Sequence, residues 1–130
     1  MRTTVPAGQD GDDMGVIRDA LSDGIDALSE ATDWIVETFP EAPEAAAAGA
    51  VPYLKLMGIV AGGWLMARAA RTAAKRLEKG DDSPFYPKKM VSARFYADHI
   101  LIQAPALAAT VTRGWAAVGR FNKADGKAGA

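Results

Sequence analysis

The side chains that are able to carry chemistry are few, and the sequence does not group them. His99 is the single histidine, and Asp98 beside it points in another direction on a helix, because adjacent residues do not share a helical face. Cysteine is absent and no further ligands gather near His99, so no metal site is predicted. The serines have no base at helical spacing, which argues against a nucleophilic triad. We therefore expect no catalytic residue, and we interpret His99 as a packed or interface histidine, with a ligand or catalytic role as the weaker alternative.

A cluster of basic residues is the candidate contact for an anion. Its members follow one another along a helix-forming stretch: Arg68, Arg71, Lys75 and Arg76. Guanidinium and ammonium groups bind phosphate and carboxylate oxygens, so the cluster suits an anionic ligand such as a nucleotide phosphate. A solvated cationic face is the competing interpretation.

Glycines on the same stretch indicate a close contact. Gly58 and Gly62 form a small-xxx-small pair, which Gly63 extends. Glycine costs about 1 kcal/mol relative to alanine inside a helix, so we expect a close backbone approach to offset that cost. The approach is either helix packing within the chain or contact with another subunit or domain. The pair is not a phosphate-binding loop, because it follows no strand.

A second line of side chains completes the candidate interface. Phe95, His99 and Ile102 follow i, i+4, i+7 spacing on a predicted helix and therefore share a face. The other notable aromatic side chains are interpreted as core residues rather than as a cofactor box: Tyr53, Trp64, Tyr96 and Trp115.

A long helix over residues 53–79 must position most of these groups. Nearly every residue from Leu54 to Ala70 is apolar or small, with Lys55 and Arg68 as the interruptions. A helix that is apolar nearly all round needs neighbours on several sides. Gly80 is typical of a helix C-cap, and residues 81–84 indicate the start of the next element.

Helices are also predicted before and after this central one. The first begins near Met14 or Val16, with Asp12 and Asp13 as caps, and ends at residues 40–43 because of their prolines. Pro52 lies either in the first turn of the central helix or at a kink in a longer helix that starts near residue 44. The third helix runs from residue 84 or 85 toward residue 119, and its Pro105 should bend or divide it.

The predicted fold class is all-α, an antiparallel bundle of three long helices that prolines break into four or five pieces. Residues 15–119 form the bundle, residues 1–14 a disordered tail and residues 120–130 a frayed tail. The formal net charge of −1 gives no field that would favour nucleic acid. We expect no membrane span, because the uncharged apolar run over residues 56–67 is too short, and no targeting segment is visible. The cytoplasm is the expected compartment.

Two runs of the sequence resemble a known family. GAVPYLKLMGIVAGGWLMARAA over residues 49–70, and Phe85-Tyr86 followed by ARFYADHIL over residues 93–101, are similar to the extra C-terminal helical domain of bacterial acyl-CoA dehydrogenases. The branch concerned resembles the 3-methylmercaptopropionyl-CoA dehydrogenases. The similarity extends roughly from Val16 to Val118.

The resemblance implies a bacterial oxidoreductase family that uses FAD to oxidise acyl-CoA in fatty acid metabolism. Its catalytic core is not contained in this chain, so no catalytic residue is carried over and an enzymatic role stays open. The function implied is that of a stand-alone or truncated C-terminal domain, a structural or docking module that binds no cofactor alone. Its partner would be a dehydrogenase core or a second copy of the chain. The alternative is a part of an active dehydrogenase that contributes to acyl-CoA or FAD binding.

Overall fold

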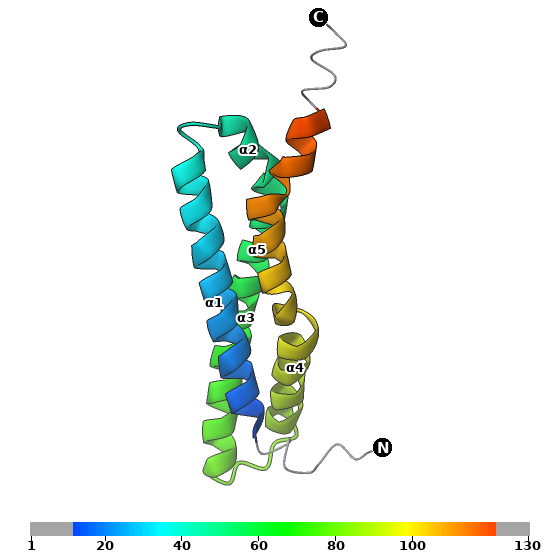
Figure 1. Cartoon of the computed structure of the whole chain (residues 1–130). Coiled ribbons are helices and arrows are strands. Elements are labelled where there is room, and N and C mark those ends of the chain that lie inside the picture. The colour runs from blue at the N-terminus through cyan, green and yellow to red at the C-terminus, as the bar shows by residue number, and fades with distance from the viewer. Residues whose placement is uncertain (1–11, 122–130) are drawn as a thin grey trace, which may run out of the picture.

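The computed structural model describes residues 12–121, and every regular element in them is helical (Figure 1). This confirms the all-α prediction. The elements are α1 (Asp13–Thr38), α2 (Pro43–Ala48), α3 (Ala50–Glu78), α4 (Phe85–His99), a 3-10 turn η2 (Leu101–Gln103) and α5 (Ala104–Arg113). Residues 115–121 are helical again. The predicted tails lie mostly outside the described residues.

The long helices lie side by side (Figure 1). In that view α1 runs from the lower end to the upper end, α2 crosses at the top, α3 returns, and α4 followed by α5 runs up again. Helix α4 packs mainly on α3, whereas α5 packs on both α1 and α3. Residues 12 and 121 therefore lie at opposite ends of the molecule.

Helix α1 begins and ends close to the predicted residues. It ends at Thr38, two residues before Pro40, which has no N–H to continue the helical hydrogen bonds, although Phe39 keeps helical angles of φ −55° and ψ −45°. The expected capping by Asp12 is wrong: its backbone, with φ −108° and ψ 13°, is outside the extended region that N-cap residues use, and its side chain makes no capping hydrogen bond. Asp13 instead contacts Arg94 of α4 at 2.9 Å.

Helix α3 begins after a turn at Gly49, and Pro52 lies in its first turn. This position suits proline, because the first N–H groups of a helix have no partner within it. At the other end Gly80 has a φ of 81°, which glycine adopts without steric cost. The N–H groups of Gly80 and Asp81 donate to the carbonyls of Leu77 and Arg76, so the predicted C-cap is confirmed.

The predicted third helix is divided, and the division lies one turn before Pro105. Helix α4 ends at His99 and α5 begins at Ala104, with Pro105 in the first turn of α5. Proline lacks an N–H and its ring clashes with the carbonyl four residues back, which here belongs to Leu101. The predicted break is therefore present, and the chain makes it in the turn before Pro105.

The core consists largely of small residues that let the helices approach closely. One cluster joins Ile17 with Ala70, Ala93 and Ala97, and the other surrounds Leu56, Val60, Leu101 and Val111. Leu101 fills a space that two glycines leave: a Cβ at Gly24 would lie 3.0 Å from a Leu101 methyl, and one at Gly63 would lie 2.9 Å from both. No polar or charged side chain among the described residues is buried.

By length and composition alone, helix α3 is long and apolar enough to cross a membrane, and only 22% of its most apolar segment is buried. Core helices of soluble proteins can have the same length and composition.

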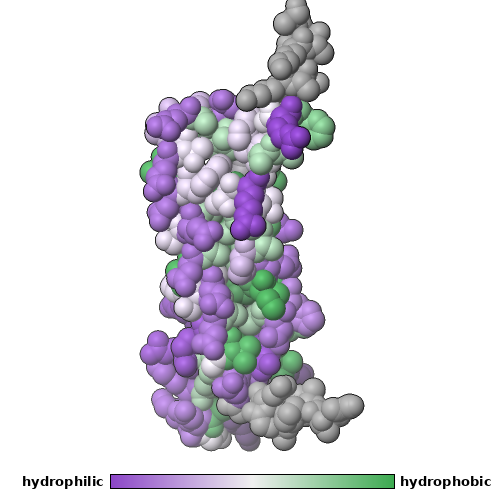
Figure 2. Space-filling view, in the orientation of Figure 1, coloured by the Kyte–Doolittle hydropathy of each residue, from purple (hydrophilic) through white to green (hydrophobic). Residues whose placement is uncertain are grey.

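On the face that Figure 2 shows, hydrophilic residues line the side formed by α1, and hydrophobic residues gather in the lower half.

Candidate functional site

The three glycines of the candidate interface have different surroundings. Gly58 is exposed, and a Cβ there would meet nothing within 4 Å. A Cβ at Gly62 would overlap the hydroxyl of Tyr96, and Gly63 is buried against Leu101. Gly62 and Gly63 therefore accommodate side chains of this chain, and Gly58 alone stays open to another molecule.

Two tyrosines fix the helices around α3. The Tyr96 hydroxyl donates a hydrogen bond of 2.7 Å to the carbonyl of Ile59, and burial raises the pKa of this tyrosine above its ordinary value. The hydroxyls of Tyr53 and Thr32 lie 2.7 Å apart and share a hydrogen bond between α3 and α1. Both aromatic rings pack against the core.

One side of α3 is apolar and is not covered by any other part of residues 12–121. Leu54, Gly58, Ala61 and Leu65 follow i, i+4, i+7, i+11 spacing and are all exposed, Leu54 by 71% and Leu65 by 57%. Val51, 79% exposed, extends the same surface. We call these five residues the α3 face. Within residues 12–121, the α3 face therefore lacks the neighbours that were predicted for several sides of this helix. Large contiguous patches of exposed apolar surface mark interaction sites.

The second predicted contact line is also exposed. Phe95 and Ile102 are 57% and 66% exposed, and the rings of Phe95 and His99 stack with centroids 4.2 Å apart. Ile102 belongs to η2, so the break in the rod interrupts the expected helical line. The interface role of these three residues stays a prediction.

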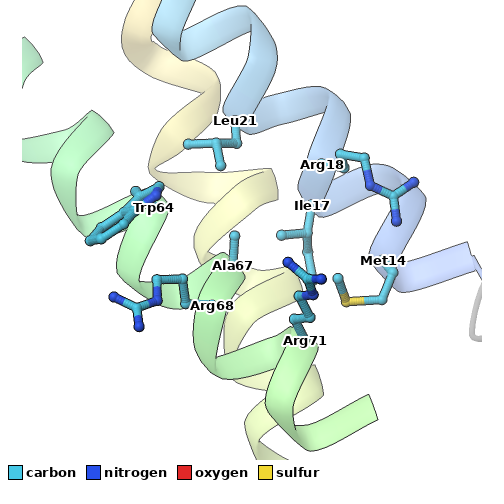
Figure 3. A pocket seen from close by; sticks show the side chains of 8 residues that line it. All are labelled: Met14, Ile17, Arg18, Leu21, Trp64, Ala67, Arg68 and Arg71. Carbon is cyan, nitrogen blue, oxygen red and sulfur yellow. The ribbon is translucent and has the colours of Figure 1, made fainter. Parts of the chain in front are cut away.

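A pocket between α1 and α3 unites part of the predicted anion cluster with a residue that sequence reasoning missed. It has a volume of about 410 Å³ and is lined by Met14, Ile17, Arg18 and Leu21 of α1 and by Trp64, Ala67, Arg68 and Arg71 of α3 (Figure 3). Lys75 and Arg76 do not line it. The available signal for Arg18 was its position as the single basic residue of α1, between Met14 and Leu21 on the edge of the apolar stripe.

The arginines of this pocket form no ion pair with a carboxylate in the described part of the chain. Arg94 forms ion pairs with Asp13 and Asp98, and its pKa is raised above its ordinary value, chiefly by a hydrogen bond from its Nε to Asp98. Arg68 lies over the ring of Trp64, 4.8 Å from its centroid. Trp64 is 49% exposed, so its interpretation as a core residue is wrong.

Carboxylates gather elsewhere, in a trough between α1 and α5 that Asp23, Asp26 and Glu30 line with Pro105. No group of three or more potential metal ligands is close enough to hold an ion within residues 12–121. The cationic pocket and the α3 face are therefore the surfaces best suited to binding.

Comparisons with known proteins show the family of this chain. A family model described as "Acetyl-CoA dehydrogenase C-terminal like" matches residues 1–121. The 3-methylmercaptopropionyl-CoA dehydrogenase of Ruegeria pomeroyi is 31% identical over 96 residues, which cover 74% of this chain and 16% of that protein. No solved structure matches. The chain belongs to the acetyl-CoA dehydrogenase C-terminal-like family.

Proposed function

We propose that this chain is a non-catalytic docking module of an acyl-CoA dehydrogenase, either stand-alone or truncated, whose α3 face contacts the dehydrogenase core. The observation that carries this proposal is the bare apolar side of a helix whose opposite side is well packed. Most of the similar dehydrogenase lies outside the matched segment, so the segment there is attached to a far larger body. A core of that size is the occupant to which we commit.

We infer that the module is an antiparallel bundle of three long helices over residues 15–119, with a tail on either side. We also infer that it acts in the cytoplasm. Support for this arrangement comes from the course of the helices in Figure 1 and from the contacts of α3 with α1, α4 and α5. Phe95, His99 and Ile102 would extend the contact surface beyond α3.

The side chains of the described residues support a non-catalytic role. Catalytic acids and bases are commonly buried groups with shifted pKa values. No charged or polar side chain is buried here, and the raised pKa values of Arg94 and Tyr96 follow from ion pairing and from packing.

The residues of the pocket do not fit a flavin. An isoalloxazine ring presents both donors and acceptors, whereas the pocket is lined by alkyl groups, a thioether, an indole and three guanidinium groups, which offer no strong acceptor. FAD, the cofactor implied for the parent family, would be held by the core of the enzyme.

A chimaera tests the docking proposal. The matched segment of the Ruegeria pomeroyi dehydrogenase is replaced by this chain, and the measurements are bound flavin absorbance, molecular mass and turnover. We expect a flavin-loaded, active chimaera, and we expect Leu54→Glu with Leu65→Glu to lose both properties, because two carboxylates would be buried without partners at the contact. Flavin loss in the unmutated chimaera, or full activity in the double variant, would contradict the proposal.

Matched controls separate docking from folding. Ser22→Glu with Ser29→Glu adds the same charge at exposed positions of α1 and should leave the chimaera active. In the isolated chain, Leu54→Glu with Leu65→Glu should change the free energy of unfolding by less than about 1 kcal/mol, because both leucines are exposed. A concentration-dependent dimer of the isolated chain, abolished by the same double substitution, would assign the α3 face to a second copy instead.

The alternative function is a contribution to acyl-CoA or FAD binding within an active dehydrogenase. Arg68 and Arg71 favour a contact with the nucleotide phosphates of either molecule, and not with the flavin ring, since they lie in a concave site and not on a flat cationic face. Saturable binding of acyl-CoA or FAD by the purified chain would support this alternative.

A further inference from the structure

The pocket between α1 and α3 combines two kinds of wall. Its floor is apolar, with Ile17 buried and Met14, Leu21 and Ala67 partly buried, and its rim carries Arg18, Arg68 and Arg71. A volume of about 410 Å³ is in the range of sites for small organic ligands. Such a lining suits a ligand that is anionic at one end and apolar at the other.

The rim carries exposed guanidinium groups from two helices. Arg18 of α1 and Arg71 of α3 both line the pocket; in Figure 3 Arg71 extends toward Ile17, whereas Arg18 extends along α1. Neither guanidinium has a carboxylate partner among residues 12–121, so both can donate to a ligand. A phosphate monoester carries more charge and more terminal acceptor oxygens than a carboxylate, which suits two or three guanidinium forks.

Trp64 supplies a wall for the rest of the ligand. It is half exposed, and Arg68 covers one side of its ring. An apolar or aromatic group on the floor between Leu21 and Trp64 would be removed from water together with the partly exposed side chains beneath it. This burial of apolar surface would favour binding.

We propose that this pocket binds a phosphate monoester attached to an apolar or aromatic body. Arg18 and Arg71 bind the phosphate, Arg68 adds a third positive charge at the edge of Trp64, and Ile17, Leu21 and Trp64 contact the body. A carboxylate of a docked protein would need the charged rim alone, whereas the concave apolar floor favours a small molecule. The proposal does not depend on docking, since the site lies within this chain.

Calorimetric titration of the whole chain with 1-naphthyl phosphate tests the proposal. We expect saturable binding with one ligand per chain, and binding of inorganic phosphate or of 1-naphthol weaker by about tenfold or more, because each lacks one half of the ligand. Equal affinity for inorganic phosphate and naphthyl phosphate, or no saturable binding of naphthyl phosphate or of the vesicles below, would overturn the proposal.

Variants assign the binding to named residues. Arg71→Gln should weaken naphthyl phosphate binding by about tenfold, whereas Lys75→Gln removes the same charge from the same helix outside the pocket and should weaken it less than twofold. Trp64→Leu should weaken naphthyl phosphate and leave inorganic phosphate unchanged. Equal losses in the Arg71 and Lys75 variants would show attraction to general charge and would overturn the site.

A vesicle arm distinguishes the sources of such a phosphate. Phosphatidylcholine vesicles with and without phosphatidic acid are sedimented with the chain and with the Arg71→Gln variant. Binding of naphthyl phosphate in solution without sedimentation supports a soluble ligand. Sedimentation that needs both phosphatidic acid and Arg71 supports the same site with a lipid headgroup as ligand. Sedimentation that Arg71→Gln does not reduce, without binding of naphthyl phosphate, would overturn the proposal. If docking fails in the chimaera and these titrations succeed, the ligand site stands alone.

Discussion

Two glycines four residues apart on α3 should respond in opposite ways to the same substitution. Gly58→Ala adds a methyl group in open space, so the better helix propensity should stabilise the isolated chain by about 0.5–1 kcal/mol. Gly62→Ala gains the same propensity but displaces the Tyr96 ring and its hydrogen bond to Ile59, and we expect a net loss. Urea unfolding should place the two variants about 2 kcal/mol apart. Equal stabilities would show that Tyr96 does not pack on Gly62 as described.

Tyr96 should also make stability depend on pH in the alkaline range. Because burial raises its pKa above the ordinary value of 10.0, the folded state holds the phenolic proton more tightly than the unfolded state does. The stabilisation is complete below pH 10 and is lost as the pH rises through the folded pKa. The free-energy difference between the wild-type chain and Tyr96→Phe should be about 1 kcal/mol near neutrality and should shrink above pH 10. A difference that stays constant through this range would contradict the assignment.

At the scale of elements, η2 places two neighbouring residues in opposite environments. Leu101 is 2% exposed and Ile102 is 66% exposed. Leu101→Ala should cost about 2–5 kcal/mol of unfolding free energy, because it leaves a cavity where three helices meet. Ile102→Ala should change it by less than about 0.5 kcal/mol. Denaturant unfolding of the two variants measures the contrast, and similar costs would mean that the turn does not insert Leu101 into the core.

The ends of the helices could be predicted from the sequence more closely than the contacts between helices. The ends of α1 and α3 follow from local chemistry at Pro40 and Gly80, which acts through neighbouring residues. The break before Pro105 was expected, but its position depends on how the chain relieves the clash one turn back. Helical spacing placed Arg68 and Arg71 on one flank, whereas their meeting with Arg18 depends on the rotation of α1 against α3, which no local signal encodes.

At the scale of the whole molecule, the apolar content of α3 is larger than this bundle can cover. The sequence predicted burial from that content, and the buried residues do fall on one stripe, from Leu56 to Ala73. The α3 face, on another side of the helix, is also apolar and has no neighbour among residues 12–121. A single sequence shows how much of a helix is apolar, but not which side of it another part of the fold covers, so the α3 face could not be predicted from the sequence.

The insertion of Leu101 between Gly24 and Gly63 has a consequence for how relatives of this chain can diverge. The three positions share one fixed volume at the meeting point of α1, α3 and η2. A bulkier residue on either long helix is tolerated only if the residue at the turn becomes smaller. Evolution should therefore change these sites jointly, as a compensating trio, while their sequence neighbours vary independently.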